Sequence, residues 1–138
     1  MLAGTELIID AFECASHRVR DLSCVRSVCD RIIEELGLTV IGIPQWHQFP
    51  DPFGVTGLYL LSESHLTCHT FPEFGLATLN LYCCRQRPEW PWELRLQEML
   101  DAKYVEIRNV LRGNVLPIGE EKLFRHVSKT TLTASRGP

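Results

Sequence analysis

The sequence has 138 residues, of which 45% are hydrophobic and 22% charged, and its net charge is −3. This length and composition are typical of one globular domain, and the chain is short for two. Because no surplus of basic residues is available to neutralise phosphates, nucleic-acid binding is disfavoured. No run approaches the ~20 apolar residues of a membrane span, and residues 1–13 lack the basic start typical of a signal peptide. We therefore expect a cytoplasmic protein whose six cysteines are free thiols.

The first third of the chain predicts a strand, a helix and a second strand. Residues 5–13 are rich in β-formers and follow a glycine, which favours a strand. In residues 21–36 the apolar side chains recur every three or four positions, which indicates an amphipathic helix, and Gly37 supplies its C-terminal stop. Residues 38–46 predict the next strand, with Pro44 weakening its far end.

The middle of the chain predicts three more strands. Two are expected at residues 55–61 and 65–71, and residues 72–75 (Pro-Glu-Phe-Gly) are typical of a turn. Residues 76–84 alternate between apolar and semi-polar side chains. This alternation predicts a strand that has one face in the core and the other face at a site.

The last part of the chain predicts a helix at about 91–102 and a final strand at 104–111. The resulting order, β-α-β-β-β-β-α-β, favours an α+β two-layer sandwich, an antiparallel sheet with two helices on one face. The other face would need cover, and a second copy of the chain is the simplest cover. We expect one domain over residues 1–118 and a weakly structured tail over residues 119–138.

The chemically richest stretch is residues 54–75, which a pair of cysteines, Cys83-Cys84, follows. It reads Gly-Val-Thr-Gly and then Ser-Glu-Ser-His-Leu-Thr-Cys-His-Thr-Phe-Pro-Glu-Phe-Gly. This stretch resembles the processing site of the prokaryotic S-adenosylmethionine decarboxylase proenzymes, whose pattern is close to GVSG … SESHL-T-x-H-T-W-P-E-x-G … C. The resemblance covers about residues 4–110.

The resemblance implies that the chain makes its own cofactor. Ser64 would attack the Glu63 carbonyl, the chain would break between these two residues, and Ser64 would become a pyruvoyl group. His69 would act as the processing base, a role that histidine commonly fills near neutral pH. Thr56 stands where the family usually has a serine that assists processing. Because the hydroxyl is kept, we expect slower cleavage rather than none.

The resemblance also implies how the cleaved protein works. The pyruvoyl carbonyl at Ser64 would form a Schiff base with the amine of a small-molecule substrate and act as an electron sink as carbon dioxide leaves. Cys84 would donate a proton to the α-carbon, whereas Cys83, on the other face of its strand, is expected to pack in the core. The two cleaved chains would remain associated, and the cleaved unit would form a homodimer or a higher oligomer.

The substrate stays open at this point. The resemblance places Phe49 and Phe71 where the family sandwiches adenine and Glu73 where it holds the ribose hydroxyls, which favours S-adenosylmethionine and spermidine biosynthesis. Packing in the core is the alternative for all three. Several positions depart from the family pattern: Phe71 replaces a tryptophan, Asn80 an aspartate and Gln48 an arginine, and Glu6 stands near a usual histidine. Arginine or ornithine is therefore an alternative substrate, and a non-processing binding homologue is a remoter alternative.

The spacing of the histidines relative to Ser64 and to each other bears on both the processing site and a candidate metal site. Ser64 and His69 are five residues apart, so on one continuous strand they would face opposite ways, and the chain would have to bend or twist between them. His65 and His69, with Cys68 and Cys84, are ligand types that suit zinc. Their β-branched, proline-bounded context predicts a strand rather than the helix that such a histidine pair needs, so we expect no metal site.

Overall fold

A computed structural model describes residues 2–114, so the expected tail at 119–138 lies outside the described residues. The strands of this part are β1 (Leu2–Phe12), β2 (Gln45–Gln48), β3 (Val55–Leu60), β4 (Ser64–Phe71), β5 (Leu76–Cys83) and β6 (Tyr104–Asn114). Its helices are α1 (Ser16–Val19), α2 (Leu22–Glu35) and α3 (Trp92–Leu100), and a short 3₁₀ helix, η1 (Pro72–Phe74), joins β4 to β5.

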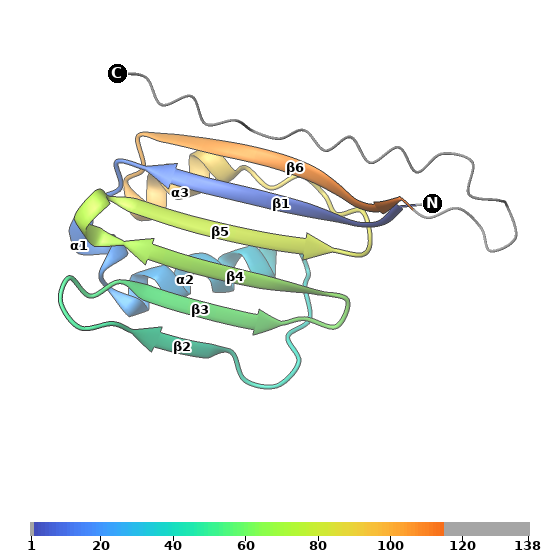
Figure 1. Cartoon of the computed structure of the whole chain (residues 1–138), viewed down its shortest axis with the longest axis horizontal. Helices are drawn as coiled ribbons and strands as arrows, with labels where there is room; N and C mark the ends of the chain where they lie inside the picture. The colour runs from blue at the N-terminus through green and yellow to red at the C-terminus, as the bar shows by residue number, and fades with distance from the viewer. Residues whose placement is uncertain (1, 115–138) are drawn as a thin grey trace, which may run out of the picture.

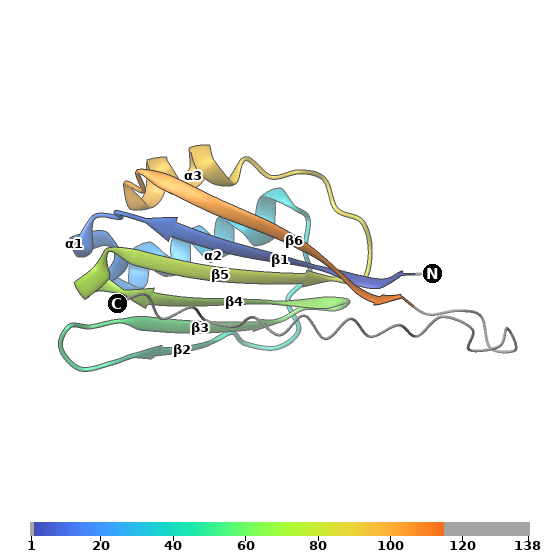
Figure 2. The same cartoon turned by 45° about the horizontal axis from the view of Figure 1, so that its top comes forward.

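The six strands form one antiparallel sheet in the order β2-β3-β4-β5-β1-β6. The first strand of the sequence, β1, is therefore inserted between β5 and β6. Figures 1 and 2 show the three α-helices on one side of this sheet. The predicted α+β two-layer sandwich is confirmed. Within residues 2–114, no helix is long and apolar enough to cross a membrane.

The structure corrects the predicted elements in several places. The predicted strand at 38–46 is wrong for most of its length, because β2 begins only at Gln45 and Gly42 has the left-handed φ of +71° that breaks an extended chain. Pro44 therefore precedes the strand rather than weakening its end. The single helical turn α1 was not predicted, and β6 continues three residues beyond the predicted end at 111.

Helix α2 shows how the sequence builds the covered side of the sheet. The Asp21 side chain caps the helix by accepting hydrogen bonds from the backbone N–H groups of Ser23 and Cys24. The buried side chains of α2 recur with helical spacing and are Val25, Val28, Cys29 and Ile32. Together with the inward side chains of the strands and of α3 they form one core. This core fixes the strands that carry the predicted site residues.

The opposite side of the sheet, which we call the open face, carries large apolar side chains that residues 2–114 leave uncovered. They are Leu58, Leu60, Phe71, Tyr104 and Val110, which are 38% to 62% exposed. Apolar side chains gathered on one face are typical of a surface that binds another protein. This is the face that the sequence analysis expects a second copy of the chain to cover.

Candidate active site

Strand β4 carries the predicted site residues from one end to the other. Along it Leu66 and Cys68 are buried beneath the helices, whereas His69 is on the open face. Ser64 is on the same side as Leu66 by the alternation of a strand, so Ser64 and His69 lie on opposite faces. The bend that the sequence analysis required between them does not occur, because Ser64–Phe71 is one continuous strand that pairs with β5 throughout.

Ser64 begins β4 directly after a tight turn that contains Glu63. Across this turn the Leu61 N–H donates to the Ser64 carbonyl oxygen at 3.0 Å. The Ser64 Oγ is buried and has no hydrogen-bond partner among the described residues. Leaving a buried hydroxyl unpaired costs about 1–3 kcal/mol. A polar atom in this state calls for a chemical or structural reason, and nucleophilic attack is one such reason.

The two cysteines at the end of β5 lie at the same end of the sheet as Ser64. Cys83 pairs directly with Ser64 in the β4–β5 ladder and is buried, whereas Cys84 is one residue past the strand and is exposed. Burial raises the pKa of the Cys83 thiol, and the guanidinium of Arg87 offsets only part of that rise. The thiol in register with Ser64 is thus the one that the sequence analysis assigned to packing.

Thr56 and His69 form a hydrogen-bonded pair on the open face. They are opposite one another in the β3–β4 ladder, and Thr56 Oγ1 lies 2.9 Å from His69 Nδ1. When Nδ1 carries the proton and donates it to Thr56, Nε2 is left free to accept one. This arrangement can therefore orient an imidazole as a base, which is the assisting role expected of Thr56.

Close packing explains the two glycines on either side of Val55-Thr56. A Cβ at Gly57 would lie 2.5 Å from the ring of Trp46, which packs over the backbone at this point. A Cβ at Gly54 would lie 2.7 Å from the carbonyl oxygen of Thr70 on β4. Because glycine alone permits both approaches, these residues fix the path of β3 and with it the position of the Thr56 hydroxyl.

The predicted substrate-binding residues lie at the end of the sheet where β4 finishes. Phe71 ends β4 on the open face and is 38% exposed, and Glu73 is exposed in η1. Phe49 follows β2 and is 50% exposed, with its ring edge-on to that of His47 at 4.6 Å between centroids. His47 is opposite Thr56 in the β2–β3 ladder. The exposure of both phenylalanines argues against the alternative that they pack in the core.

The candidate residues therefore form two groups at opposite ends of the sheet. The Ser64 group consists of Glu63, Ser64 and Cys84; the His69 group consists of Phe49, Thr56, His69, Phe71 and Glu73. At ~3.3 Å per residue, Ser64 is about 16 Å along β4 from His69 and about 23 Å from Phe71. Residues 2–114 of one chain do not bring the two groups into contact.

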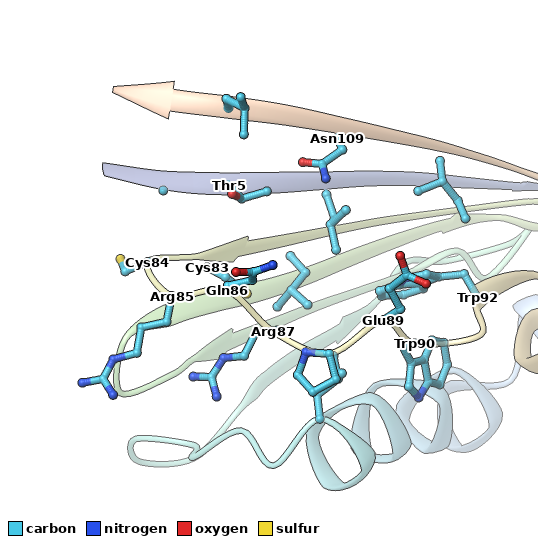
Figure 3. Close-up of a pocket in the computed structure, with 17 residues that line it drawn as sticks. Thr5, Cys83, Cys84, Arg85, Gln86, Arg87, Glu89, Trp90, Trp92 and Asn109 are labelled. Carbon is cyan, nitrogen blue, oxygen red and sulfur yellow. The ribbon is translucent and has the colours of Figure 1, made fainter. Parts of the chain in front are cut away.

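A pocket of about 800 Å³ lies on the helix side of the sheet at the Ser64 end. It opens between the inward side chains of β1, β5 and β6 and the segment 84–90 (Figure 3). Cys83, Cys84 and two arginines, Arg85 and Arg87, line it near the Ser64 group. The His69 group contributes nothing to this pocket, so one chain offers a cavity beside Ser64 but no complete set of candidate residues around it.

The residues considered as zinc ligands do not come together. Cys68 is buried on the helix side of β4, whereas His65 and His69 are on the open face, four residues apart. Across residues 2–114, no cluster of three or more histidine, cysteine, aspartate or glutamate side chains could hold a metal ion.

Sequence reasoning missed three side chains that lie beside the candidates. Arg85 and Arg87 both make ion pairs with the Glu63 carboxylate. Pairing the strands outward from the predicted turn at 72–75 would have placed these arginines next to Glu63. His47 was missed because the strand that carries it was predicted at the wrong residues.

Comparisons with known proteins agree on one family. The model of the family described as S-adenosylmethionine decarboxylase matches residues 5–113. A protein from Thermotoga petrophila, named S-adenosylmethionine decarboxylase proenzyme, is 32% identical over 118 residues, which cover 84% of this chain and 88% of that protein. The chain belongs to the S-adenosylmethionine decarboxylase family.

Two further similarities support membership of this family, whose members are carboxy-lyases. A proenzyme of the same name from Archaeoglobus fulgidus is 33% identical over 106 residues, covering 75% of this chain and 93% of that protein. The crystal structure of the adenosylmethionine decarboxylase from Aquifex aeolicus superposes with a TM-score of 0.71 at 25% identity, covering 87% of this chain and 98% of that chain. The resemblance inferred from the Ser-Glu-Ser-His motif is therefore confirmed.

Proposed function

We propose that this chain cleaves itself between Glu63 and Ser64, converts Ser64 into a pyruvoyl group, and decarboxylates S-adenosylmethionine for spermidine biosynthesis. The observation that carries the proposal is the buried Ser64 hydroxyl, which is unpaired among the described residues and follows directly on the turn at Glu63. A hydroxyl without a hydrogen-bond partner is free to act on the carbonyl that precedes it. Cys83, the neighbour of Ser64 in the sheet, lines a pocket that offers space beside a group formed from Ser64.

The proposed cleavage uses atoms that this chain supplies, together with one water. The Ser64 Oγ bonds to the Glu63 carbonyl carbon as the C–N bond breaks, and the hydroxyl proton moves to the released amine. His69 then removes the Ser64 Cα proton, the Cβ–Oγ bond breaks, and Glu63 leaves as a carboxylate. Water adds to the imine form of the dehydroalanine at position 64 and ammonia departs. The chain then has a new C-terminus at Glu63 and a blocked N-terminus at position 64.

The processing base is proposed to come from a second copy of the chain. Within one chain His69 is about 16 Å along β4 from Ser64 and on the opposite face. If two copies pack through their open faces with their strands running in opposite directions, the His69 end of one copy meets the Ser64 end of the other. The exposed apolar side chains of that face suit such a pairing. The Ser64 hydroxyl faces the helices, but Ser64 is the first residue of β4, so His69 of the second copy would reach the Ser64 Cα proton past the end of the sheet. Each active site would then combine the Ser64 group of one copy with the His69 group of the other.

The cleaved fragments are proposed to stay together because their strands alternate in one sheet. Cleavage would leave β1, β2 and β3 in one fragment and β4, β5 and β6 in the other. β1 lies between β5 and β6, and β3 pairs with β4. Separating the fragments would therefore break three strand interfaces and the core. The six free cysteines fit the reducing cytoplasm proposed for this protein.

During turnover, a pyruvoyl group supplies a carbonyl that captures the substrate amine and an electron sink for the loss of carbon dioxide. The contribution of this chain is a proton for the α-carbon. Cys84 is the proposed donor, since it matches the family position and is exposed at the Ser64 end. Cys83 is a second candidate, because it is in register with Ser64 and burial raises its pKa, which keeps the thiol protonated at neutral pH.

Substrate binding is assigned to Phe49, Phe71 and Glu73. Both aromatic rings are exposed at the end of the sheet that would meet the Ser64 group of a second copy. Stacking on an aromatic side chain is worth ~1–3 kcal/mol per base in nucleic-acid-binding proteins. The Glu73 carboxylate can accept both hydroxyls of a ribose. The proposed substrate agrees with the names of the relatives from Thermotoga petrophila and Archaeoglobus fulgidus.

An arginine or ornithine decarboxylase would need a free carboxylate for the distal cation of its substrate. On the open face Glu6 is engaged: Asn80 donates to it at 2.6 Å and Arg112 contacts its other oxygen. The hydrogen bond from Asn80 and, after it, the one from Arg112 lower the pKa of Glu6. This carboxylate is therefore already occupied by partners within the chain. Glu73 and Asp51 are exposed carboxylates that could bind such a cation instead.

Purified protein separates these functions directly. We expect fragments of residues 1–63 and 64–138, the second with an N-terminus that reacts with carbonyl reagents, whereas Ser64→Ala stays one chain. Release of carbon dioxide from labelled S-adenosylmethionine, arginine and ornithine then identifies the substrate. A wild-type chain that remains intact after prolonged incubation would refute self-cleavage and favour the non-processing homologue.

A further inference from the structure

Two arginines hold the side chain of the residue that precedes the proposed cleavage point. Arg85 Nη2 lies 2.5 Å from one carboxylate oxygen of Glu63, and Arg87 Nη2 lies 3.6 Å from the other. Each oxygen therefore has a guanidinium of its own. The Glu63 side chain is only 31% exposed, so water screens these ion pairs less than it screens pairs on a fully exposed surface.

The strand register brings these residues together from distant positions in the sequence. Cys83 pairs with Ser64 at the end of the β4–β5 ladder, so the chain leaves β5 beside the turn that contains Glu63. Arg85 and Arg87 follow within four residues of that pair. In Figure 3 both side chains extend toward the same side of the segment after β5.

Arg87 is the more enclosed of the two. Its side chain is 25% exposed, against 72% for Arg85. Its Nε N–H is buried and has no hydrogen-bond partner among the described residues. Placing a guanidinium in such a site is unfavourable unless a carboxylate compensates, and Glu63 is the carboxylate that does so. Arg87 should therefore contribute more than Arg85 to holding Glu63.

We propose that Arg85 and Arg87 are positioning residues for self-cleavage and that they retain the end of the N-terminal fragment afterwards. The inference rests on the proposed cleavage at Ser64. Before cleavage, the two ion pairs fix the Glu63 side chain and thereby restrict the peptide unit that the Ser64 hydroxyl must approach. Holding reacting groups in an attack geometry accelerates an intramolecular step. After cleavage, Glu63 has a second, terminal carboxylate, and the two guanidinium groups balance both negative charges.

The first test is the rate of cleavage, which intact-mass measurements follow over time on protein freshly made by cell-free translation. The double variant Arg85→Gln, Arg87→Gln should cleave about tenfold more slowly than wild type, with Arg87→Gln causing most of the loss. Lysine at both positions keeps the charges and should restore the rate to within about threefold. The matched control is Arg26→Gln, which removes an ion pair with Asp30 on α2 and should cleave at the wild-type rate.

Two further readouts distinguish positioning from a general loss of structure. Adding Glu63→Gln to the double variant should slow cleavage no further, because the contact is already lost. About 1 M NaCl should slow wild-type cleavage and leave the double variant unaffected, because salt screens the ion pairs. In the cleaved wild type a carboxypeptidase should leave Glu63 in place, whereas in the double variant, once cleaved, it should remove Glu63.

The outcomes separate this inference from the proposed function. A wild-type chain that never cleaves refutes the self-cleavage itself. A wild-type chain that cleaves, with a double variant that cleaves equally fast, refutes only the role of Arg85 and Arg87. The same inference is overturned if lysine gives no rescue and Glu63→Gln slows the double variant further, because the loss would then have another origin.

Discussion

If His69 of one copy processes Ser64 of the other, two variants that cannot cleave alone should rescue each other. In one chain these residues are about 16 Å apart along β4, whereas proton transfer needs contact at ~3 Å. A mixed dimer of Ser64→Ala and His69→Ala contains one complete site, because the His69→Ala chain keeps its Ser64 and receives an intact His69. With equal amounts and random assembly, about half of the dimers are mixed, so about a quarter of all chains should cleave.

The assay needs the two variants to differ in mass, which a small tag on one of them provides. After co-expression, intact mass should show that every new fragment comes from the His69→Ala chain, since Ser64→Ala lacks the nucleophile. Each variant alone at the same total concentration is the control and should stay whole. If a pull-down on the tag proves that mixed dimers have formed and no fragment appears, cleavage does not occur between copies. Cleavage of His69→Ala alone would instead show that another group is the base.

Three other predictions concern the two thiols and the substrate. Cys84→Ser should leave cleavage largely intact and lower the rate of decarboxylation at least ~100-fold. Cys83→Ser should lower the rate of decarboxylation to this extent only if Cys83, rather than Cys84, is the proton donor. Burial raises the pKa of Cys83, so its thiolate forms only at higher pH, and near pH ~8 iodoacetamide should modify Cys84 first. Phe49→Ala or Phe71→Ala should lower kcat/KM for S-adenosylmethionine about tenfold or more, which corresponds to a loss of ~1.4 kcal/mol. The proposed substrate is wrong if arginine or ornithine is turned over faster and these substitutions do not change that turnover.

The fold was predictable wherever a local pattern and the tertiary environment agree. The helix predicted at 21–36 is observed at Leu22–Glu35, because its apolar spacing matches the face that it buries. The strand predicted at 76–84 ends one residue earlier, at Cys83. The prediction for 38–46 was wrong because an apolar, β-branched run can also form a loop against a core. The left-handed Gly42 decides for the loop there, and its φ cannot be read from the residue type alone.

The residues of the candidate site could be proposed from the sequence, whereas their arrangement in space could not. The motif identified Ser64 and His69 by resemblance, and the hydrogen bond between Thr56 and His69 agrees with the assisting role expected of Thr56. Arg85 and Arg87 were missed because they contact Glu63 through strand register, which depends on pairs far apart in the sequence.

The five-residue spacing between Ser64 and His69 itself carries structural information. Five residues between Ser64 and His69 put them on opposite faces of a strand, and the structure keeps that strand straight and fully paired. A bend would have to break hydrogen bonds with β3 and β5 on both sides of β4. Combining two identical chains leaves those bonds intact and also covers the apolar open face. An active site shared between two copies is therefore the explanation that we propose for the five-residue spacing and for the uncovered face.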